Sequence, residues 1–410
     1  MSNTDNEWFI FRGNSAGSES DKPHTNIEER LPPPPNWRPF GSSVSPGVSR
    51  RKRRGRTFQT RLNEVKMVNA ALYLRRPLLI TGKPGTGKSS IAYAIAEELD
   101  LGEVLYWPIT TRTTLKSGLY NYDAIGRLQE VKQLEVQGKL AEHEASTEAE
   151  ASKHPAPISK GQIDNAQKSE AQQVADFITL GPLGTALLKS SRPRVLLIDE
   201  IDKSDIDLPN DLLTIFEEGR FEIPELLRLE KDDPDGTQDA EPTKVRVRTA
   251  YSDMEDAIAK RDRKATVEGG RVICNEFPLV ILTSNGERDF PPPFLRRCLR
   301  LNMHKPDRPQ LIKIVKKHFE RIDKKGEKHV DISDTQIDYW ISAFLEKRDE
   351  KNEQLAADQL LNALFMVAQE KGPVGDDLDK FIKDYVLASL DRPLPADIDG
   401  KATASRAKRP

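Results

Sequence analysis

The distribution of hydrophobic residues divides the chain into two parts. Up to about residue 303, short runs of consecutive apolar residues are separated by segments with helical spacing. These runs predict buried strands at 78–81, 104–110, 195–199, 279–285 and 299–303. Continuous apolar runs are typical of a parallel sheet that is covered on both faces. The first part is therefore predicted to be an α/β domain.

Apolar residues at helical spacing predict the helices of both parts. In the first part, helices are expected at 58–75, where Pro77 ends the pattern, and at 89–99. Beyond Pro306 every pattern is helical, with apolar stripes at 308–321, 334–347, 356–371 and 377–390. Ser333-Asp334-Thr335-Gln336 fits a capping box, and Gly372 fits a helix stop. The second part is predicted to be a bundle of about four helices.

Two segments carry neither pattern. Residues 1–56 are polar and rich in Gly and Pro, and they end in the basic run Arg50–Arg56. Residues 128–175 are rich in Ala, Glu, Gln, Lys and Ser. We expect a tail and an insert here, because such compositions bury little apolar surface. Trp37 and Phe40 are exceptions, and they are expected to attach the tail to the folded part.

Composition excludes several classes of protein. The 63 basic and 65 acidic residues give a net charge of −2, which argues against nucleic-acid binding by bulk charge. Apolar runs span four or five residues, whereas a membrane helix needs about 20. The N-terminus does not resemble a secretory signal, and two cysteines exclude a disulfide scaffold or a cysteine-based zinc finger. A soluble, cytoplasmic protein without membrane insertion is expected.

The strongest chemical signal follows the first predicted strand. Gly82-Lys83-Pro84-Gly85-Thr86-Gly87-Lys88-Ser89 matches the phosphate-binding pattern G-x-x-x-x-G-K-[ST] in full. Its glycines allow a tight turn whose N–H groups, with the following helix N-terminus, bind an anion. Lys88 is expected beside the β- and γ-phosphates, and the Ser89 hydroxyl on Mg²⁺. The predicted nucleotide-binding residues are Gly82, Pro84, Gly85, Thr86, Gly87, Lys88, Ser89 and Ser90.

Two other predicted strands end in polar residues. The run 195–198 is followed by Asp199 and Glu200, and the run 279–282 leads to Asn285. Ligands of α/β sheets bind at the carboxyl ends of strands, so Asp199 is predicted to face the metal and Glu200 to act as general base. Asn285 can reach the same water or the γ-phosphate, although it can also simply begin the Asn285-Gly286 turn.

Taken together, these segments resemble an AAA+ ATPase. The similar segments are GKPGTGKSS (82–90), LLIDEID (196–202), ILTSNGERDF (281–290) and FLRRC (294–298), in that order. The segment 180–188, LGPLGTALL, resembles a motif of the MoxR-like branch. The resemblance covers roughly residues 57–390.

This resemblance implies a P-loop fold, ATP and Mg²⁺ as ligands, and a ring that is usually hexameric. The fold would have a parallel five-stranded sheet of order 5-1-4-3-2, followed by a small all-helical lid. Lys88, Asp199, Glu200 and Asn285 fall on the Walker A lysine, the Walker B pair and sensor 1. The arginine finger, which acts on a neighbour's nucleotide, falls on Arg297, with Arg296 as the second choice.

The resemblance also sets the expected domain boundaries. They are a tail (1–56), an ATPase core (57–303) with an insert at about 111–175, a lid (304–392) and a C-terminal tail (393–410). A hairpin is expected within 109–128, where Tyr120 and Tyr122 would face a pore or belong to the core. The third lid helix begins QLAADQLL, without the sensor 2 arginine of the family.

Three functions remain open at this stage. The first is an ATP-hydrolysing ring that remodels or assembles a client protein. The second, suggested by Arg50–Arg56, is a nucleic-acid or restriction-type motor, which the charge balance does not favour. The third is an ATP-gated signalling scaffold with slow turnover.

Overall fold

The computed structural model describes residues 31–32, 34–35, 37, 55–133, 136, 170–229, 242–251, 263–319, 332–369 and 376–392. The chain divides into two compact units, which are treated separately below. The α/β unit comprises residues 61–81 and 91–302, and the helical unit comprises 303–410 with 1–60 and 82–90. No helix of the described residues is long and apolar enough to cross a membrane.

The α/β unit is built on a parallel five-stranded sheet. Its strands are β1 (Leu78–Thr81), β2 (Leu105–Pro108), β5 (Val195–Asp199), β10 (Leu279–Ser284) and β11 (Leu299–Asn302). They lie in the order β11-β1-β10-β5-β2. Numbered among themselves along the chain, this is 5-1-4-3-2, the order implied by the resemblance. All five predicted strands are present within two residues of their expected ends.

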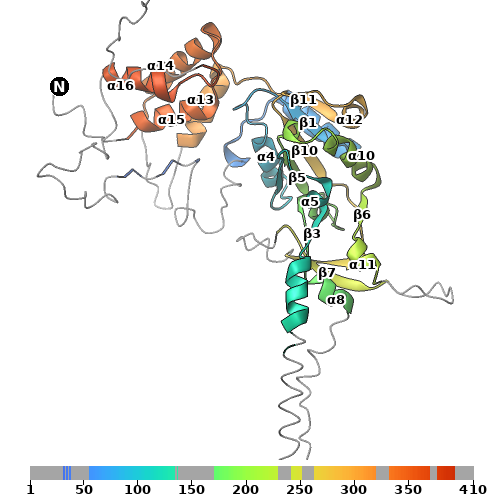
Figure 1. The fold of residues 1–410 in the computed structure, drawn as a ribbon. Helices are drawn as coiled ribbons and strands as arrows, with labels where there is room; N and C mark the ends of the chain where they lie inside the picture. The colour runs from blue at the N-terminus through green and yellow to red at the C-terminus, as the bar shows by residue number, and fades with distance from the viewer. Residues whose placement is uncertain are drawn as a thin grey trace, which may run out of the picture. The chain divides into compact units, whose positions relative to one another are not determined.

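Helices cover this sheet because its strands are apolar on both faces. All six residues of β10 and the first four of β5 are buried. The helices of this unit are α3 (Leu62–Leu74), α4 (Ser90–Glu98), α5 (Leu115–Leu119), α8 (Glu170–Ala175), α9 (Pro182–Ala186), α10 (Leu208–Glu218), α11 (Pro224–Leu227) and α12 (Pro292–Arg297). In Figure 1, α4 lies on one side of the sheet and α10 on the other.

A second, six-stranded sheet was not predicted. Its strands are β3 (Tyr120–Tyr122), β4 (Ile178–Leu180), β6 (Arg220–Glu222), β7 (Lys244–Arg248), β8 (Lys264–Glu268) and β9 (Arg271–Ile273), in the order β3-β4-β7-β8-β9-β6. Four of the six have only three residues, which is too short for a periodic pattern to be recognised. In β7, basic residues alternate with Val245 and Val247, and only the valines are buried.

The hairpin expected within 109–128 is wrong in detail. Within this segment only β3 is a strand, and it pairs antiparallel with β4, on the far side of the insert. Tyr120 is buried, stacks on Phe221 and donates a 2.8 Å hydrogen bond to Glu225 Oε2. Tyr122 is half-buried and accepts a 3.1 Å hydrogen bond from Arg127. Tyr120 is thus a core residue. Most of the insert lies outside the described residues.

The helical unit matches the predicted bundle. It contains α13 (Arg308–Phe319), α14 (Asp334–Leu345), α15 (Ala357–Val367) and α16 (Asp376–Phe381), with π-helical turns at 346–350 and 382–386. The Ser333 capping box is present, with the Gln336 N–H donating to the Ser333 hydroxyl at 3.2 Å. Gly372 lies outside the described residues. Trp340 and Phe344 of α14 are the largest fully buried side chains of its core.

Trp37 attaches the N-terminal segment to this bundle, as predicted. Its Nε1 donates a 3.1 Å hydrogen bond to Asn362, and its ring meets Phe319 and Phe365 edge-on at 5.7 Å. Phe40 and most of the basic run Arg50–Arg56 lie outside the described residues.

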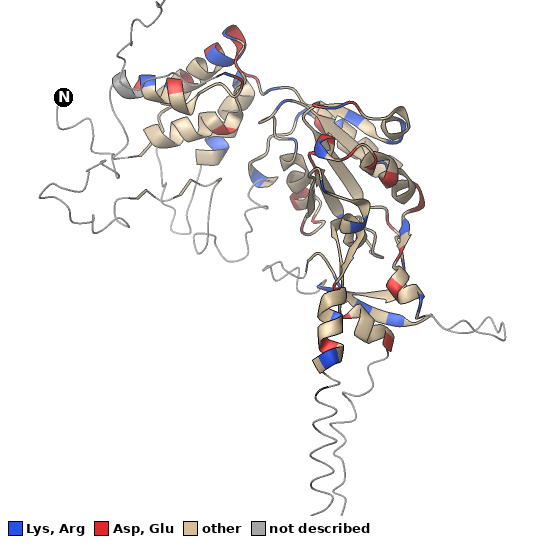
Figure 2. Ribbon diagram, viewed as in Figure 1, with Lys and Arg blue, Asp and Glu red and all other residues tan. Residues whose placement is uncertain are grey.

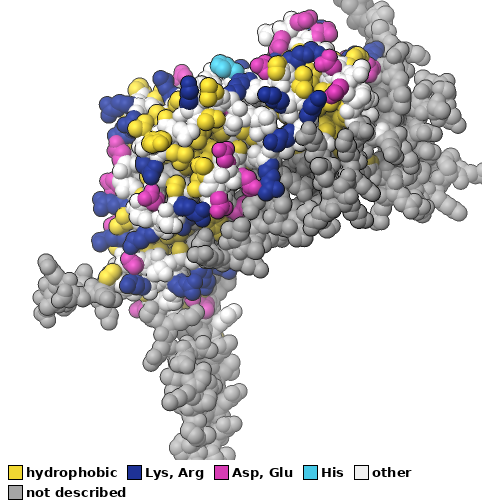
Figure 3. Space-filling view, turned by 180° about the vertical axis from the view of Figure 1, so that it is seen from behind, with side chains coloured by type: hydrophobic (Ala, Val, Ile, Leu, Met, Phe, Trp, Pro, Cys, Tyr) yellow, Lys and Arg dark blue, Asp and Glu magenta, His cyan; other side chains and the backbone are white. Residues whose placement is uncertain are grey.

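The described surface carries charges of both signs. Figure 2 shows basic and acidic residues interspersed over both units, as expected from a net charge near zero. The face seen in Figure 3 mixes hydrophobic side chains with charged ones. Among the described residues, charge alone therefore singles out no binding partner.

Candidate functional site

The phosphate-binding loop leaves β1 at Thr81 and leads into α4. Gly85 and Gly87 have φ angles of 76° and 88°, which L side chains rarely adopt. The loop encloses Lys88, whose Nζ donates to the carbonyl oxygens of Gly82 at 2.7 Å and Lys83 at 3.1 Å. The hydroxyl of Thr86 also donates to the Lys83 carbonyl, at 2.9 Å. The buried ammonium is therefore held at the centre of the turn.

Close neighbours also require glycine at these positions. A Cβ on Gly85 would lie 2.5 Å from the Cβ of Ala356, and one on Gly87 would lie 2.8 Å from the ring of Phe58. Lys83 and Pro84 line a cavity of about 230 Å³, together with Lys305, residues 352–355, Leu390 and Asp391. The loop before α15 thus lies against the phosphate-binding loop within the helical unit.

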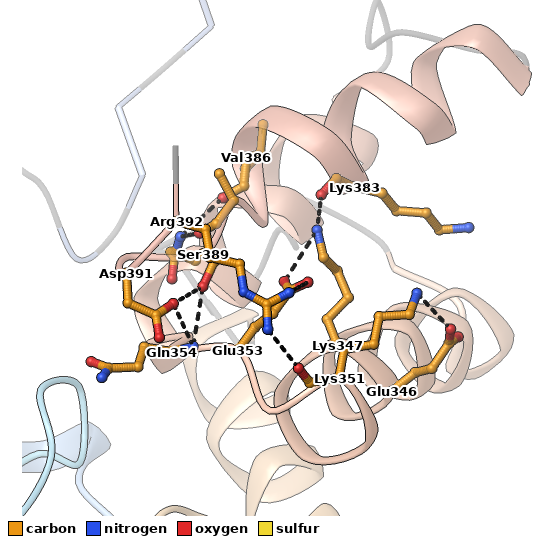
Figure 4. A network of polar contacts seen from close by, with 12 residues as sticks. Glu346, Lys347, Lys351, Glu353, Gln354, Lys383, Val386, Ser389, Asp391 and Arg392 are labelled. Carbon is orange, nitrogen blue, oxygen red and sulfur yellow. Dashed lines mark hydrogen bonds and ion pairs between the residues drawn. The ribbon is translucent and has the colours of Figure 1, made fainter. Parts of the chain in front are cut away.

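A network of polar contacts fixes this loop before α15 (Figure 4). The buried Glu353 carboxylate lies 3.6 Å from Lys347 Nζ and 3.4 Å from Arg392 Nη1. Arg392 also donates to the Lys351 carbonyl at 2.9 Å, and the N–H of Gln354 donates to Ser389 Oγ at 3.2 Å. Residues 389–392 are therefore tied to residues 351–354.

No arginine stands in the first turn of α15. Gln359 occupies this turn, and its Oε1 accepts from the N–H of Ala356 at 2.9 Å. Its Nε2 donates to the carbonyl of Ala388 at 2.7 Å. The side chain caps the helix and binds the chain's own backbone.

The acidic pair lies at the carboxyl end of β5. Asp199 Oδ1 accepts a 2.6 Å hydrogen bond from the Thr283 hydroxyl, and Oδ2 accepts one at 3.3 Å from Tyr106. Burial, and then the charge of Asp199, raise the pKa of Tyr106 to about 12. Tyr106 therefore stays protonated and remains a donor at neutral pH.

Glu200 has an unusual backbone conformation. Its φ of 63° is left-handed, which is uncommon for a residue other than glycine. Its N–H donates to Thr283 Oγ1 at 2.9 Å, and its carboxylate accepts a 2.6 Å hydrogen bond from Lys203 Nζ. That hydrogen bond raises the pKa of Lys203 above its ordinary value.

Asn285 follows β10, and Asp202 holds its turn. The Oδ2 of Asp202 accepts hydrogen bonds from the N–H of Asn285 at 2.9 Å and of Glu287 at 3.2 Å. Asp202 is buried, and its role here is structural. Arg288 adds a 2.7 Å hydrogen bond to the Ser204 carbonyl.

The sheet brings these groups to one edge of the α/β unit. In the parallel register Trp107 lies beside Ile198, Ile198 beside Leu282, and Ser284 beside Thr81. Asp199, Glu200 and Asn285 therefore lie at the carboxyl ends of adjacent strands, and the phosphate-binding loop leaves the next strand from the same edge.

Sequence reasoning missed the supporting residues Thr283, Tyr106 and Lys203. A hydroxyl in an otherwise apolar strand was the available signal for Thr283.

The two candidate finger arginines differ in their surroundings. Arg297, at the end of α12, donates through Nε to Glu217 of α10 and through Nη1 to the Pro293 carbonyl at 3.4 Å. The hydrogen bond from Arg297 lowers the pKa of Glu217. Arg296 is exposed. Both arginines lie on α12, where Arg297 contacts Glu217 and Pro293.

The chemistry of the two predicted metal ligands fits magnesium. Ser89 and Asp199 offer oxygen ligands, which Mg²⁺ prefers, and Mg²⁺ commonly takes only one or two protein carboxylates. Among the described residues, no group of three or more His, Cys, Asp or Glu side chains could hold a metal by itself.

Comparisons with known proteins give one family match and one similar solved structure. Residues 77–261 match the family described as AAA domain (dynein-related subfamily). A solved structure of a presumed ATPase from Cytophaga hutchinsonii is similar at 10% identity, over 77% of this chain and 70% of that chain, with a TM-score of 0.32. No curated protein sequence matches this chain.

Proposed function

Because the chain belongs to the AAA+ ATPase family, we propose that it binds ATP with Mg²⁺ and hydrolyses the γ-phosphate. Residues 57–303 would be the ATPase core and residues 304–392 its lid. The observation that carries the proposal is Glu200, a carboxylate with a left-handed backbone, fixed beside Asp199. Strained backbone at a strand end is a recurrent feature of functional sites.

Binding would rest on the loop from Gly82 to Ser90. The ammonium of Lys88, now held by two carbonyl oxygens, provides the positive charge for the β- and γ-phosphates. Gly85 and Gly87 leave the backbone free of side chains, and Pro84 and Thr86 shape the turn. The N-terminus of α4, with Ser89 and Ser90, adds donors for an anion.

Hydrolysis would rest on the edge of the sheet. Asp199 and Ser89 would hold Mg²⁺, which would neutralise charge on the β- and γ-phosphates. Glu200 would accept the proton of the attacking water, and Asn285 would orient that water or the γ-phosphate. The finger arginine, Arg297 or else Arg296, would come from a neighbouring copy of the chain.

We further propose a MoxR-like ring, hexameric in the family's usual form, that remodels or assembles a client protein. The motif resemblance at 180–188 supports the branch, and a finger that acts on a neighbour requires association. Leu62, Tyr73 and Leu74 of α3 are 70%, 86% and 59% exposed, and apolar side chains exposed along one helix favour contact with another chain.

A slow, ATP-gated switch is the second candidate. Two contacts favour it, because both engage groups that hydrolysis needs. Glu200 is paired with Lys203, and Arg297 is paired with Glu217. Multiple-turnover kinetics at saturating ATP would separate the two functions, since a switch would release product too slowly for continuous turnover. The nucleic-acid motor gains no support from the described residues.

Nucleotide binding by Lys88→Ala tests the first step. We expect its affinity for a fluorescent ATP analogue to fall by at least tenfold, because the loop loses its buried cation. Lys83→Ala, which removes an exposed lysine of the same loop, is the matched control and should bind nearly as wild type does. Equal affinities of wild type and Lys88→Ala would refute binding at this loop.

A further inference from the structure

We infer that Thr283 is a positioning residue that sets both carboxylates of the site, Asp199 and Glu200, through a single hydroxyl. The inference rests on the proposed ATPase function and extends it to a residue that has no role among the site residues assigned above. Thr283 lies on β10, two residues before Asn285, and its side chain is 1% exposed. It does not touch the nucleotide in this scheme and acts only through its neighbours.

The hydroxyl of Thr283 both donates and accepts a hydrogen bond. It donates its proton to Asp199 Oδ1 at 2.6 Å and accepts the N–H of Glu200 at 2.9 Å. Threonine and serine combine one donor with acceptor lone pairs on a single short side chain, whereas valine has the same shape without either. Both bonds therefore depend on one atom.

The position of this hydroxyl follows from the strand register. Leu282 lies beside Ile198, so Thr283 stands next to Asp199, where β5 ends. On its other side, the end of β5 is held by the backbone, because the N–H of Ile109 donates to the Asp199 carbonyl at 3.0 Å. On the side of β10, the backbone of Glu200 does not continue the strand, because its φ is 63°. The Thr283 hydroxyl accepts the hydrogen bond that the Glu200 N–H donates.

Two functions of the site would then be coupled through Thr283. A hydrogen bond to a metal-binding carboxylate fixes its orientation, and removal of such outer partners commonly weakens metal binding 10–100-fold. A hydrogen bond to the N–H of Glu200 fixes the backbone from which the general base projects. Loss of the hydroxyl should therefore weaken Mg²⁺ use and slow hydrolysis together.

The test compares Thr283→Val, which keeps the shape, with Thr283→Ser, which keeps the hydroxyl. Thr185→Val is the matched control, because the buried Thr185 hydroxyl accepts the N–H of Ala250 at 2.9 Å, outside the carboxylate cluster. One measurement is the Mg²⁺ concentration that half-saturates binding of a fluorescent ATP analogue. The other is kcat at saturating ATP and Mg²⁺.

For Thr283→Val we expect the Mg²⁺ requirement to rise about 10–100-fold. We expect kcat to fall by up to about 100-fold, the loss that a misplacement near 1 Å can cause. Thr283→Ser should remain within about threefold of wild type in both measurements, since it keeps the two hydrogen bonds. Thr185→Val should unfold at a lower temperature but keep both values.

The inference is overturned if Thr283→Val behaves as wild type, or if Thr283→Ser is as defective as Thr283→Val. Should the valine variant fail to fold, Thr283→Cys replaces it, because a thiol is a weak donor and acceptor of nearly serine's shape. If the wild type binds Mg²⁺-nucleotide without hydrolysing it, the proposed hydrolysis is refuted. The Mg²⁺ requirement of Thr283→Val still tests the role of Thr283 in that case. Absence of Mg²⁺-dependent binding in wild type would overturn both.

Discussion

At the scale of single residues, the contact between Lys203 and Glu200 is one that the proposed mechanism must break. Their side chains are 44% and 42% exposed, and exposed ion pairs contribute about 1 kcal/mol or less. Glu200 cannot accept a proton from water at the oxygen that Lys203 occupies. The pair therefore lowers the rate only modestly, and it does not exclude catalysis.

Lys203→Met should raise kcat by up to about fivefold, since about 1 kcal/mol of competition is removed from the barrier. Steady-state ATP hydrolysis measures this, and nucleotide affinity should not change. Lys189→Met is the control, because it breaks a comparable exposed pair with Glu268. A fall in kcat that is specific to Lys203→Met would show that the lysine supports the base and does not compete for it.

Residue types that form a contiguous motif could be predicted from the sequence, and isolated supporting residues could not. The phosphate-binding loop, Asp199, Glu200 and Asn285 were singled out because each group follows an apolar run. Thr283 and Asp202 act through hydrogen bonds across two strand ends that are 83–85 residues apart in the chain. Such contacts depend on strand register, which the hydrophobic pattern of one strand does not contain.

At the scale of elements, α13 carries a half-buried titratable group that packs against Trp37. His318 meets the ring of Trp37 edge-on at 6.0 Å, and its Nδ1 lies 2.8 Å from the Ile314 carbonyl. Burial lowers the pKa of His318 below its ordinary value of 6.5. The unfolded chain therefore takes up this proton at a higher pH than the folded unit does.

The contribution of His318 to stability is thus complete above pH 6.5 and is lost as the pH falls through the lower pKa of the folded state. We expect the wild-type unfolding temperature to fall more steeply than that of His318→Gln between pH 6.5 and about pH 5. His304→Gln, at an exposed position, is the matched control. Parallel curves for wild type and His318→Gln would contradict this assignment.

Long elements with a strong period were predictable, whereas the second sheet was not. The parallel strands are buried on both faces, so each appears as an uninterrupted apolar run. The helical stripe of α14 and its Ser333 cap were likewise readable. In contrast, β3, β4, β6 and β9 have three residues each and are defined by pairing with distant segments. Their existence depends on tertiary contacts more than on local pattern.

At the scale of the whole molecule, Arg297 links the single chain to the proposed ring. In this chain its guanidinium donates to Glu217, so it must exchange that partner for a neighbour's phosphate. The exchange is plausible in energy, because Glu217 is 54% exposed and surface pairs contribute little. Bulk properties such as the net charge of −2 do not predict a role for Arg297 between copies of the chain, since they carry no information on association.

Arg297→Ala should lower kcat by about 10³-fold or more, the usual effect of removing a finger arginine. Mixing it with Lys88→Ala should restore part of the activity, because the lysine variant supplies a finger to the intact nucleotide site of its neighbour. Arg296→Ala is the matched control and should stay within a few-fold of wild type. If Arg296→Ala is the inactive variant, the finger is Arg296, and failure of every mixture to regain activity would argue against action in trans.

The central claim is that Glu200 is the general base of an ATPase. Its most direct test is steady-state ATP hydrolysis by wild type and Glu200→Gln at equal nucleotide occupancy. We predict Mg²⁺-dependent turnover by wild type, and a rate about 10²–10⁴-fold lower for Glu200→Gln with unchanged ATP affinity. Equal rates for the two proteins, or no hydrolysis by wild type that has bound Mg²⁺ and ATP, would contradict the claim.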